Sequence, residues 1–160
     1  MQPWHEESLM ETKSFHATKF FHAQPKGSSS IVKRDPKHIE RALRALDYHI
    51  VEHKLQQSGY LNPQIKSMKK ECMRFLALCM TQPRPCSPSF LVDEFWHQCI
   101  LHTALYAQIT SIAGRFIHHH PSDGSAESAA QNRQSFWNTI DAYEAIWGTP
   151  NLSIWGIKRR

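Results

Sequence analysis

The spacing of the apolar residues constrains the fold of this chain more than any other feature. From Asp35 onward these residues recur every three or four positions, which is the period of one face of a helix and not of a strand. Two of the runs begin with Asp35-Pro36 and Asn62-Pro63. A capping side chain accepts a free backbone N–H there, and proline at the first helical position needs no such partner. The pattern therefore predicts an all-α fold.

Helix stops and breakers divide the chain into elements. Gly59, Gly114 and Gly148 are typical helix ends, and three prolines within 82–88 require a loop. We predict an irregular bundle of about five helices, covering residues 35–58, 62–81, 89–102, 104–113 and 126–147. Thr103 is the expected cap of the fourth helix, unless the third helix simply continues through it. The segment 115–121 is expected to be extended or irregular. The apolar stretch 152–155 is expected to dock on the bundle.

The length of 160 residues fits one domain with flanking segments. Residues 1–34 are polar, contain the linker-like stretch 27–30 and show no sustained apolar period, so we expect a flexible N-terminal segment. The domain itself is predicted over 35–157. A basic tail follows at 158–160.

Targeting signals and membrane segments are not evident. The N-terminus lacks a basic region followed by an apolar core, and the longest apolar run extends only from Phe75 to Met80. We expect a cytoplasmic protein that does not enter a membrane. In that compartment its four cysteines should be reduced, and they form no CxxC pair.

Charge argues against nucleic acid as the main partner. The formal net charge is +5, and the basic residues are scattered along the chain. A nucleic-acid-binding protein usually concentrates them on one face. The unusual feature of the composition is its 11 histidines. They matter because neutral imidazole is a good metal ligand.

The candidate site lies in the histidine-rich segment 93–121. Asp93 and His97 are four residues apart on a predicted helix, so they share one face. The chain returns about twenty residues later with three consecutive histidines. We predict metal ligands at Asp93, His97, His118 and His119. Such a set suits zinc or iron. Candidates of second rank are Cys99, His102 and His120.

A structural interpretation of the same residues stays open. An Asp and a His one turn apart often form an ordinary hydrogen bond, and a buried Cys99 would be an inert thiol. Trp96 and Tyr106 are interpreted as packing residues. The sequence contains no HExxH, EF-hand, P-loop, GxGxxG or GxSxG motif.

One segment resembles the glycine-rich domain-containing protein-like family in its short bacterial form. The resemblance covers about residues 65–157 and rests on Pro88-Ser89, Val92-Asp93, Trp96-His97 and the run from Ile100 to Tyr106, followed by Gly114 and His118-His119. It implies a polar or metal site at the Asp and His positions, but no settled activity. The family pattern has a second histidine where this chain has Cys99, which puts a ligand role there in doubt.

Two functions follow as hypotheses. The first is a metal-binding helical domain, with an enzymatic activity on a small molecule left open. The second is a non-catalytic protein-interaction module in which Asp93 and His97 fix the segment around His118 by hydrogen bonds.

Overall fold

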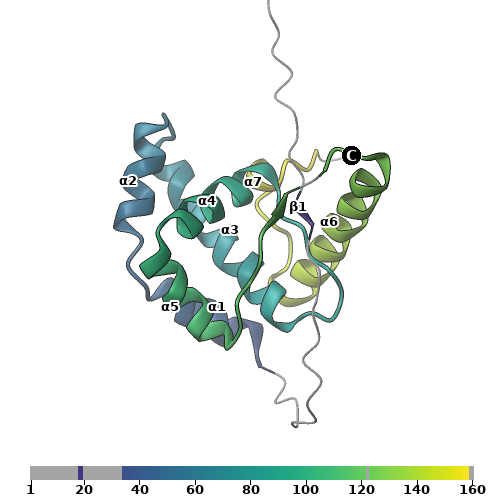
Figure 1. The fold of residues 1–160 in the computed structure, drawn as a ribbon, viewed down its shortest axis with the longest axis horizontal. Helices are drawn as coiled ribbons and strands as arrows, with labels where there is room; N and C mark the ends of the chain where they lie inside the picture. The colour runs from purple at the N-terminus through teal and green to yellow at the C-terminus, as the bar shows by residue number, and fades with distance from the viewer. Residues whose placement is uncertain (1–17, 20–33, 122, 159–160) are drawn as a thin grey trace, which may run out of the picture.

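The computed structural model describes residues 18–19, 34–121 and 123–158, and the fold within them is helical (Figure 1). Seven helices are present: α1 (Pro36–Arg44), α2 (His49–Gln57), α3 (Asn62–Thr81), α4 (Phe90–Leu101), α5 (Thr103–Ala113), α6 (Ala126–Trp147) and α7 (Leu152–Trp155). The all-α prediction is confirmed. The predicted number of helices was too low, because the first predicted helix is two helices and the C-terminal tail forms one more.

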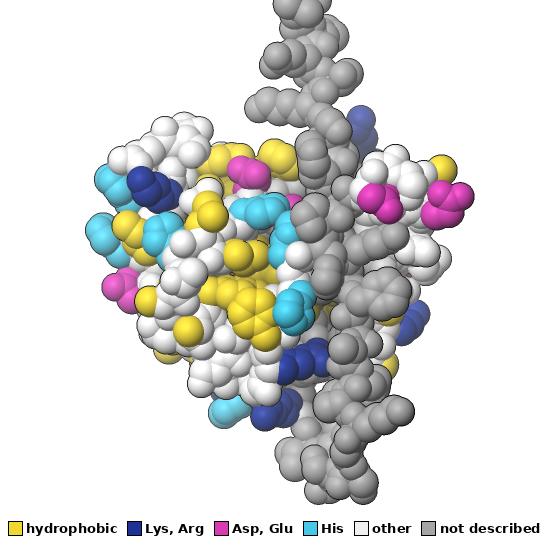
Figure 2. All heavy atoms as spheres, viewed as in Figure 1, with side chains coloured by type: hydrophobic (Ala, Val, Ile, Leu, Met, Phe, Trp, Pro, Cys, Tyr) yellow, Lys and Arg dark blue, Asp and Glu magenta, His cyan; other side chains and the backbone are white. Residues whose placement is uncertain are grey.

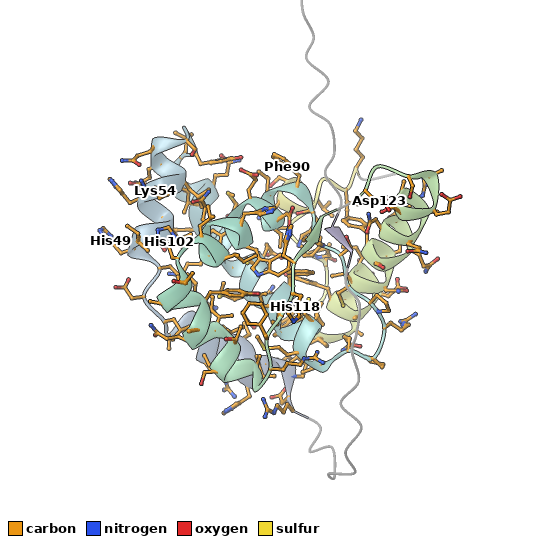
Figure 3. The ribbon with its side chains drawn as sticks, in the orientation of Figure 1. His49, Lys54, Phe90, His102, His118 and Asp123 are labelled. Carbon is orange, nitrogen blue, oxygen red and sulfur yellow. The ribbon has the colours of Figure 1, made fainter. Side chains whose placement is uncertain are left out.

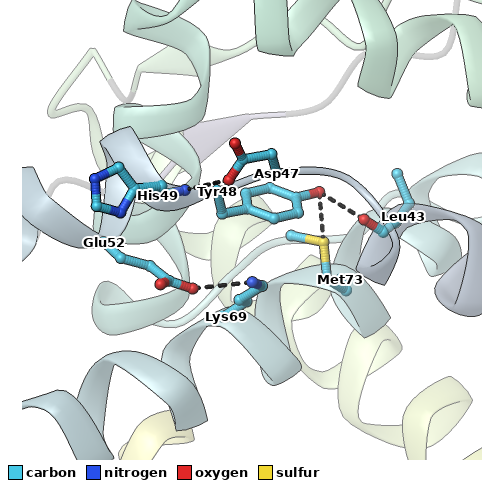
Figure 4. Close-up of polar contacts among 7 residues, drawn as sticks. All are labelled: Leu43, Asp47, Tyr48, His49, Glu52, Lys69 and Met73. Atoms are coloured by element: carbon cyan, nitrogen blue, oxygen red, sulfur yellow. Dashed lines mark hydrogen bonds and ion pairs between the residues drawn. The ribbon is translucent and has the colours of Figure 1, made fainter.

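The break between α1 and α2 was missed because no glycine or proline marks it. Tyr48 inserts its buried ring into the core there, and its hydroxyl donates to the carbonyl of Leu43 at 3.0 Å (Figure 4). That carbonyl lies in the last turn of α1 and also accepts from the backbone N–H of Leu46 at 3.2 Å. The side chain of Asp47 accepts from the backbone N–H of His49 at 2.9 Å and starts α2. As a result Ile50, which repeats at helical spacing after Ile39, Leu43 and Leu46, is 42% exposed.

α3 is the central helix of the bundle. It contacts α1, α2, α4, α6 and α7. It begins at Asn62, but the cap position is Leu61 and no side chain caps the helix, so the predicted capping role of Asn62 was wrong by one residue. Its second half is buried on nearly every side, including Phe75, Leu76 and Leu78. A helix that is apolar all round is a core helix, so the other helices are arranged about it. The four cysteines are free thiols, all of them buried.

α4 begins at Ser89, whose hydroxyl accepts from the N–H of Val92 at 3.3 Å. The same hydroxyl donates to the carbonyl of Ile154 in α7 at 2.8 Å. One side chain therefore caps α4 and ties it to the C-terminal tail. The tail docks as predicted, with Trp155 buried and its indole N–H donating to Glu71 at 2.8 Å.

α5 follows α4 almost directly. The cap position is His102, which makes no side-chain capping bond, and Thr103 is already in the helix. The expectation that Thr103 caps the helix was therefore wrong by one residue. Gly114 ends α5 at φ +67°, a left-handed conformation that favours glycine.

One short β pairing joins distant parts of the chain. β1 (Thr18–Lys19) pairs antiparallel with β2 (His120–Pro121), so that Thr18 faces Pro121 and Lys19 faces His120. No strand was predicted, because two residues carry no detectable alternation. The predicted flexible segment 1–34 and the basic tail fall mainly outside the described residues. No helix in the described ranges is long and apolar enough to cross a membrane.

Candidate metal centre

Helix α4 supplies two of the candidate ligands. Asp93 and His97 lie four residues apart on it, and Asp93 is in the first turn. The N-terminus of a helix carries partial positive charge, which favours a carboxylate at this place. The carboxylate oxygen Oδ2 of Asp93 lies 3.5 Å from Nδ1 of His97. The predicted common face is thus present.

His119 comes from the extended segment that leads from α5 to β2. Successive side chains of an extended chain point to opposite sides. Ile117 is buried, and His119 is half-buried on the same side. The hydroxyl of Tyr106, in α5, donates to the carbonyl of Ile117 and fixes this segment two residues before His119.

The three side chains converge on one point. Nε2 of His119 lies 3.3 Å from Oδ1 of Asp93, and the rings of His97 and His119 are 4.2 Å apart between centroids. One ligand atom from each residue can be chosen so that all three lie within 4.8 Å of one another. Ligand atoms about 2.1 Å from a shared ion lie roughly 3–4 Å apart, so the set is compatible with a single divalent ion.

The three candidate ligands differ in how far their side chains are exposed to solvent. The side chain of Asp93 is 9% exposed and that of His119 is 12% exposed, but that of His97 is 40% exposed. Beneath them lies the fully buried ring of Trp96, 4.8 Å from the His119 ring and 5.8 Å from Phe75 between centroids. The centre has an apolar floor and opens to solvent at His97.

His118 lies on the other side of the extended segment. It is exposed, and its ring packs against Phe116 with 4.8 Å between centroids. Figure 2 shows histidine side chains beside a hydrophobic patch on this face, and Figure 3 places His118 there. The alternation of an extended chain explains why His119 joins the cluster and its neighbour does not.

A family model matches residues 40–146. The chain belongs to the UCP032817-like family. All three clustered residues lie within the matched part of this UCP032817-like chain, whereas α7 lies outside it. No curated protein and no solved structure matches the chain.

Cys99 and His102, two of the three second-rank candidates, do not reach the cluster of this UCP032817-like domain. Cys99 is fully buried in the core, and burial raises the pKa of its thiol strongly. His102 interacts through Nδ1 with the carbonyl of Gln98 at 2.7 Å, and Figure 3 shows it away from His118. The side chain of His120 lies outside the described residues.

Sequence reasoning missed two supporting residues of this UCP032817-like site. Trp96 and Tyr106 are buried, as their interpretation as packing residues required. In addition, Trp96 contacts His119, and Tyr106 holds the Ile117 carbonyl. The position of Trp96, directly before His97, was a usable signal for the first role. The role of Tyr106 depends on the path of the extended segment, and no spacing of residues in the sequence indicates that path.

Proposed function

We propose that this protein binds one divalent transition-metal ion, zinc or ferrous iron, through Asp93, His97 and His119, and acts on a small molecule there. The observation that carries the proposal is the convergence of these three side chains from two separate segments. Two imidazoles and one carboxylate are a donor set of catalytic zinc sites and of non-haem iron(II) sites.

The arrangement of the residues supports a centre with open positions. Three protein ligands leave room in the coordination sphere for water or a substrate, unlike the four ligands of a structural zinc site. The exposed side chain of His97 marks the accessible side. A bound ion would supply a Lewis acid for a substrate oxygen or a water molecule.

The chain's own residues would orient and shield this centre. Asp93 lies between the two imidazoles and contacts one with each carboxylate oxygen. These contacts hold both rings beside the carboxylate, so the three candidate ligands would already be gathered for a shared ion. The buried ring of Trp96 excludes water from beneath His119. A substrate must therefore approach from the side of His97.

The adjacent histidines offer a matched test by elemental analysis of untagged protein. Wild type and His118→Ala should carry near-stoichiometric zinc or iron after incubation with either ion, whereas His119→Ala should not. The analysis also distinguishes the two metals. If His119→Ala binds as much metal as wild type, the proposed centre is wrong.

A rescue experiment separates ligand loss from misfolding. Free imidazole should restore metal binding to His119→Ala, because the deleted ring leaves space for it. Circular dichroism should show a helical fold in both variants. If no variant and no wild-type sample takes up metal, the Asp93 contacts are structural, and the interaction-module hypothesis replaces this proposal.

We also propose that this chain is related to the glycine-rich domain-containing protein-like family. Its support is the motif Val92-Asp93 followed by Trp96-His97, whose Asp and His are two members of the cluster.

A further inference from the structure

Two of the four cysteines lie beside each other where α3 passes into the following loop. Cys79 is in the last turn of α3, and Cys86 is in the loop that joins α3 to α4. Both are free thiols, and their side chains interact through a hydrogen bond between the two thiols. Two thiols in contact are the arrangement from which a disulfide can form.

The loop is held on both sides of Cys86. The N–H of Ser87 donates to the hydroxyl of Thr139, on α6, at 2.9 Å. The side-chain amide of Asn138, also on α6, donates to the carbonyl of Pro85 at 3.3 Å. The residues directly before and after Cys86 are therefore bound to one helix, and tertiary contacts set the position of its thiol.

This pair is nearer to solvent than the other two cysteines. Cys72 and Cys99 are 0% exposed, whereas Cys79 is 5% and Cys86 is 4% exposed. Cys86 directly follows three exposed residues, 83–85. Oxidation of a cysteine depends on its exposure as well as on its thiolate character. A small oxidant should therefore react with this pair before it reaches the thiols of the core.

The surroundings give the two thiols different acidities. The hydrogen bond from Cys79 lowers the pKa of Cys86 against the opposing effect of burial, and a hydrogen bond with Thr139 and the charge of Arg84 lower it further. Burial raises the pKa of Cys79 well above its ordinary value, so this thiol keeps its proton and donates it. The thiolate is the nucleophilic form of cysteine. Cys86 is therefore the group that attacks first.

We propose that Cys79 and Cys86 are a redox-active pair, in which Cys86 reduces hydrogen peroxide and Cys79 then closes a reversible disulfide. The proposal is independent of the metal centre, because neither cysteine belongs to its cluster.

The reaction has two steps. First the sulfur of Cys86, whose proton has passed to solvent, attacks one peroxide oxygen; the O–O bond breaks, a sulfenic acid forms, and the departing hydroxide takes a proton and leaves as water. Then the sulfur of Cys79 attacks the oxidised sulfur; the S–O bond breaks, and the hydroxide leaves with the Cys79 proton as a second water. The two sulfurs lose two electrons, which the peroxide gains. A small thiol reverses the reaction by thiol–disulfide exchange.

The test counts free thiols in the full chain. Reduced protein is first dialysed against a chelator, so that no metal ion reacts with the oxidant. It is then treated with hydrogen peroxide, quenched, unfolded and alkylated. The intact mass should show four alkylated thiols before treatment and two afterwards, and a small dithiol should restore all four. Fragmentation of the digested protein should identify the bond as one between Cys79 and Cys86.

Three variants assign the two roles. Cys79→Ala should stop at a sulfenic acid on Cys86, which dimedone traps, because the second thiol is missing. Cys86→Ala should keep its three remaining thiols. Cys99→Ala is the matched control, since it removes a buried thiol outside the pair, and it should form the disulfide as wild type does.

The result with wild type decides the proposal even where a variant does not fold. If wild type keeps four free thiols at a peroxide concentration that oxidises free cysteine, the proposal is wrong. It is also wrong if the disulfide contains Cys72 or Cys99, or joins two chains. Dimedone on Cys79 instead of Cys86 would overturn the assigned order of the two steps.

Discussion

The hydroxyl of Tyr106 donates a hydrogen bond to the carbonyl of Ile117 and so links helix α5 to the segment that carries His119. Trp96, on α4, contacts the same hydroxyl and also lies against the His119 ring. Three separate segments therefore determine where the imidazole of His119 lies. The candidate centre depends on this positioning as much as on its ligands.

Tyr106→Phe should weaken metal binding by about ten- to a hundredfold, the usual effect of losing a supporting contact behind a ligand. The buried carbonyl of Ile117 would lose this donor, at a cost of about 1–3 kcal/mol in unfolding free energy. Metal affinity is measured by competition with a chelating dye. Tyr48→Phe is the matched control, because it also removes a buried hydroxyl that donates to a carbonyl, that of Leu43. Equal metal affinity in both variants would contradict a positioning role.

Cys99→Ala should bind as much metal as wild type. The thiol is fully buried and lies outside the cluster. Elemental analysis beside His97→Ala gives the comparison. Loss of metal in the cysteine variant, with an unchanged circular dichroism spectrum, would show that the thiol is a ligand after all.

The protein should lose stability in alkaline solution. Burial raises the pKa of the thiols of Cys72, Cys79 and Cys99 above the ordinary value of about 9. The buried protonated thiols contribute fully to the free energy of unfolding below that pH. Their contribution declines above it, because the unfolded chain releases thiol protons that the folded chain keeps. Each thiol should lower the unfolding free energy by about 1.4 kcal/mol per pH unit. Urea unfolding between pH 8 and pH 10 measures the slope, which Cys99→Ala should reduce.

Asn132→Leu should stabilise the protein against thermal unfolding. The buried side-chain amide has no hydrogen-bond partner in the described residues, and an apolar side chain of similar size removes a desolvation cost of about 1–3 kcal/mol. Thermal unfolding of the variant beside wild type and Gln131→Ala, a change at the exposed neighbouring residue, shows the effect. A lower melting temperature in Asn132→Leu would mean that the amide is satisfied in solution.

Local signals in the sequence predicted most helix ends correctly. Asp35-Pro36, Gly114 and Gly148 mark boundaries that the structure contains, because they act through the backbone of their own turn. The division between α1 and α2 was not predictable in this way. It depends on Tyr48 reaching its tertiary partners Leu43 and Met73.

The part of the candidate site that lies on one helix was predictable, and the part on the extended segment was not. Helical spacing placed Asp93 and His97 together, because one turn of helix fixes their distance. The choice between His118 and His119 required the direction of each side chain along an extended segment. That direction is set by the burial of Ile117 and the bond from Tyr106.

The hydroxyl of Ser89 joins the first turn of α4 to the carbonyl of Ile154, near the C-terminal end of the chain. Detachment of the tail and loosening of the helix that carries Asp93 and His97 are therefore coupled equilibria. Any extension fused to the C-terminus that pulls α7 from the bundle would remove the acceptor of that hydroxyl. A C-terminal affinity tag can therefore change metal binding at a centre far away in sequence.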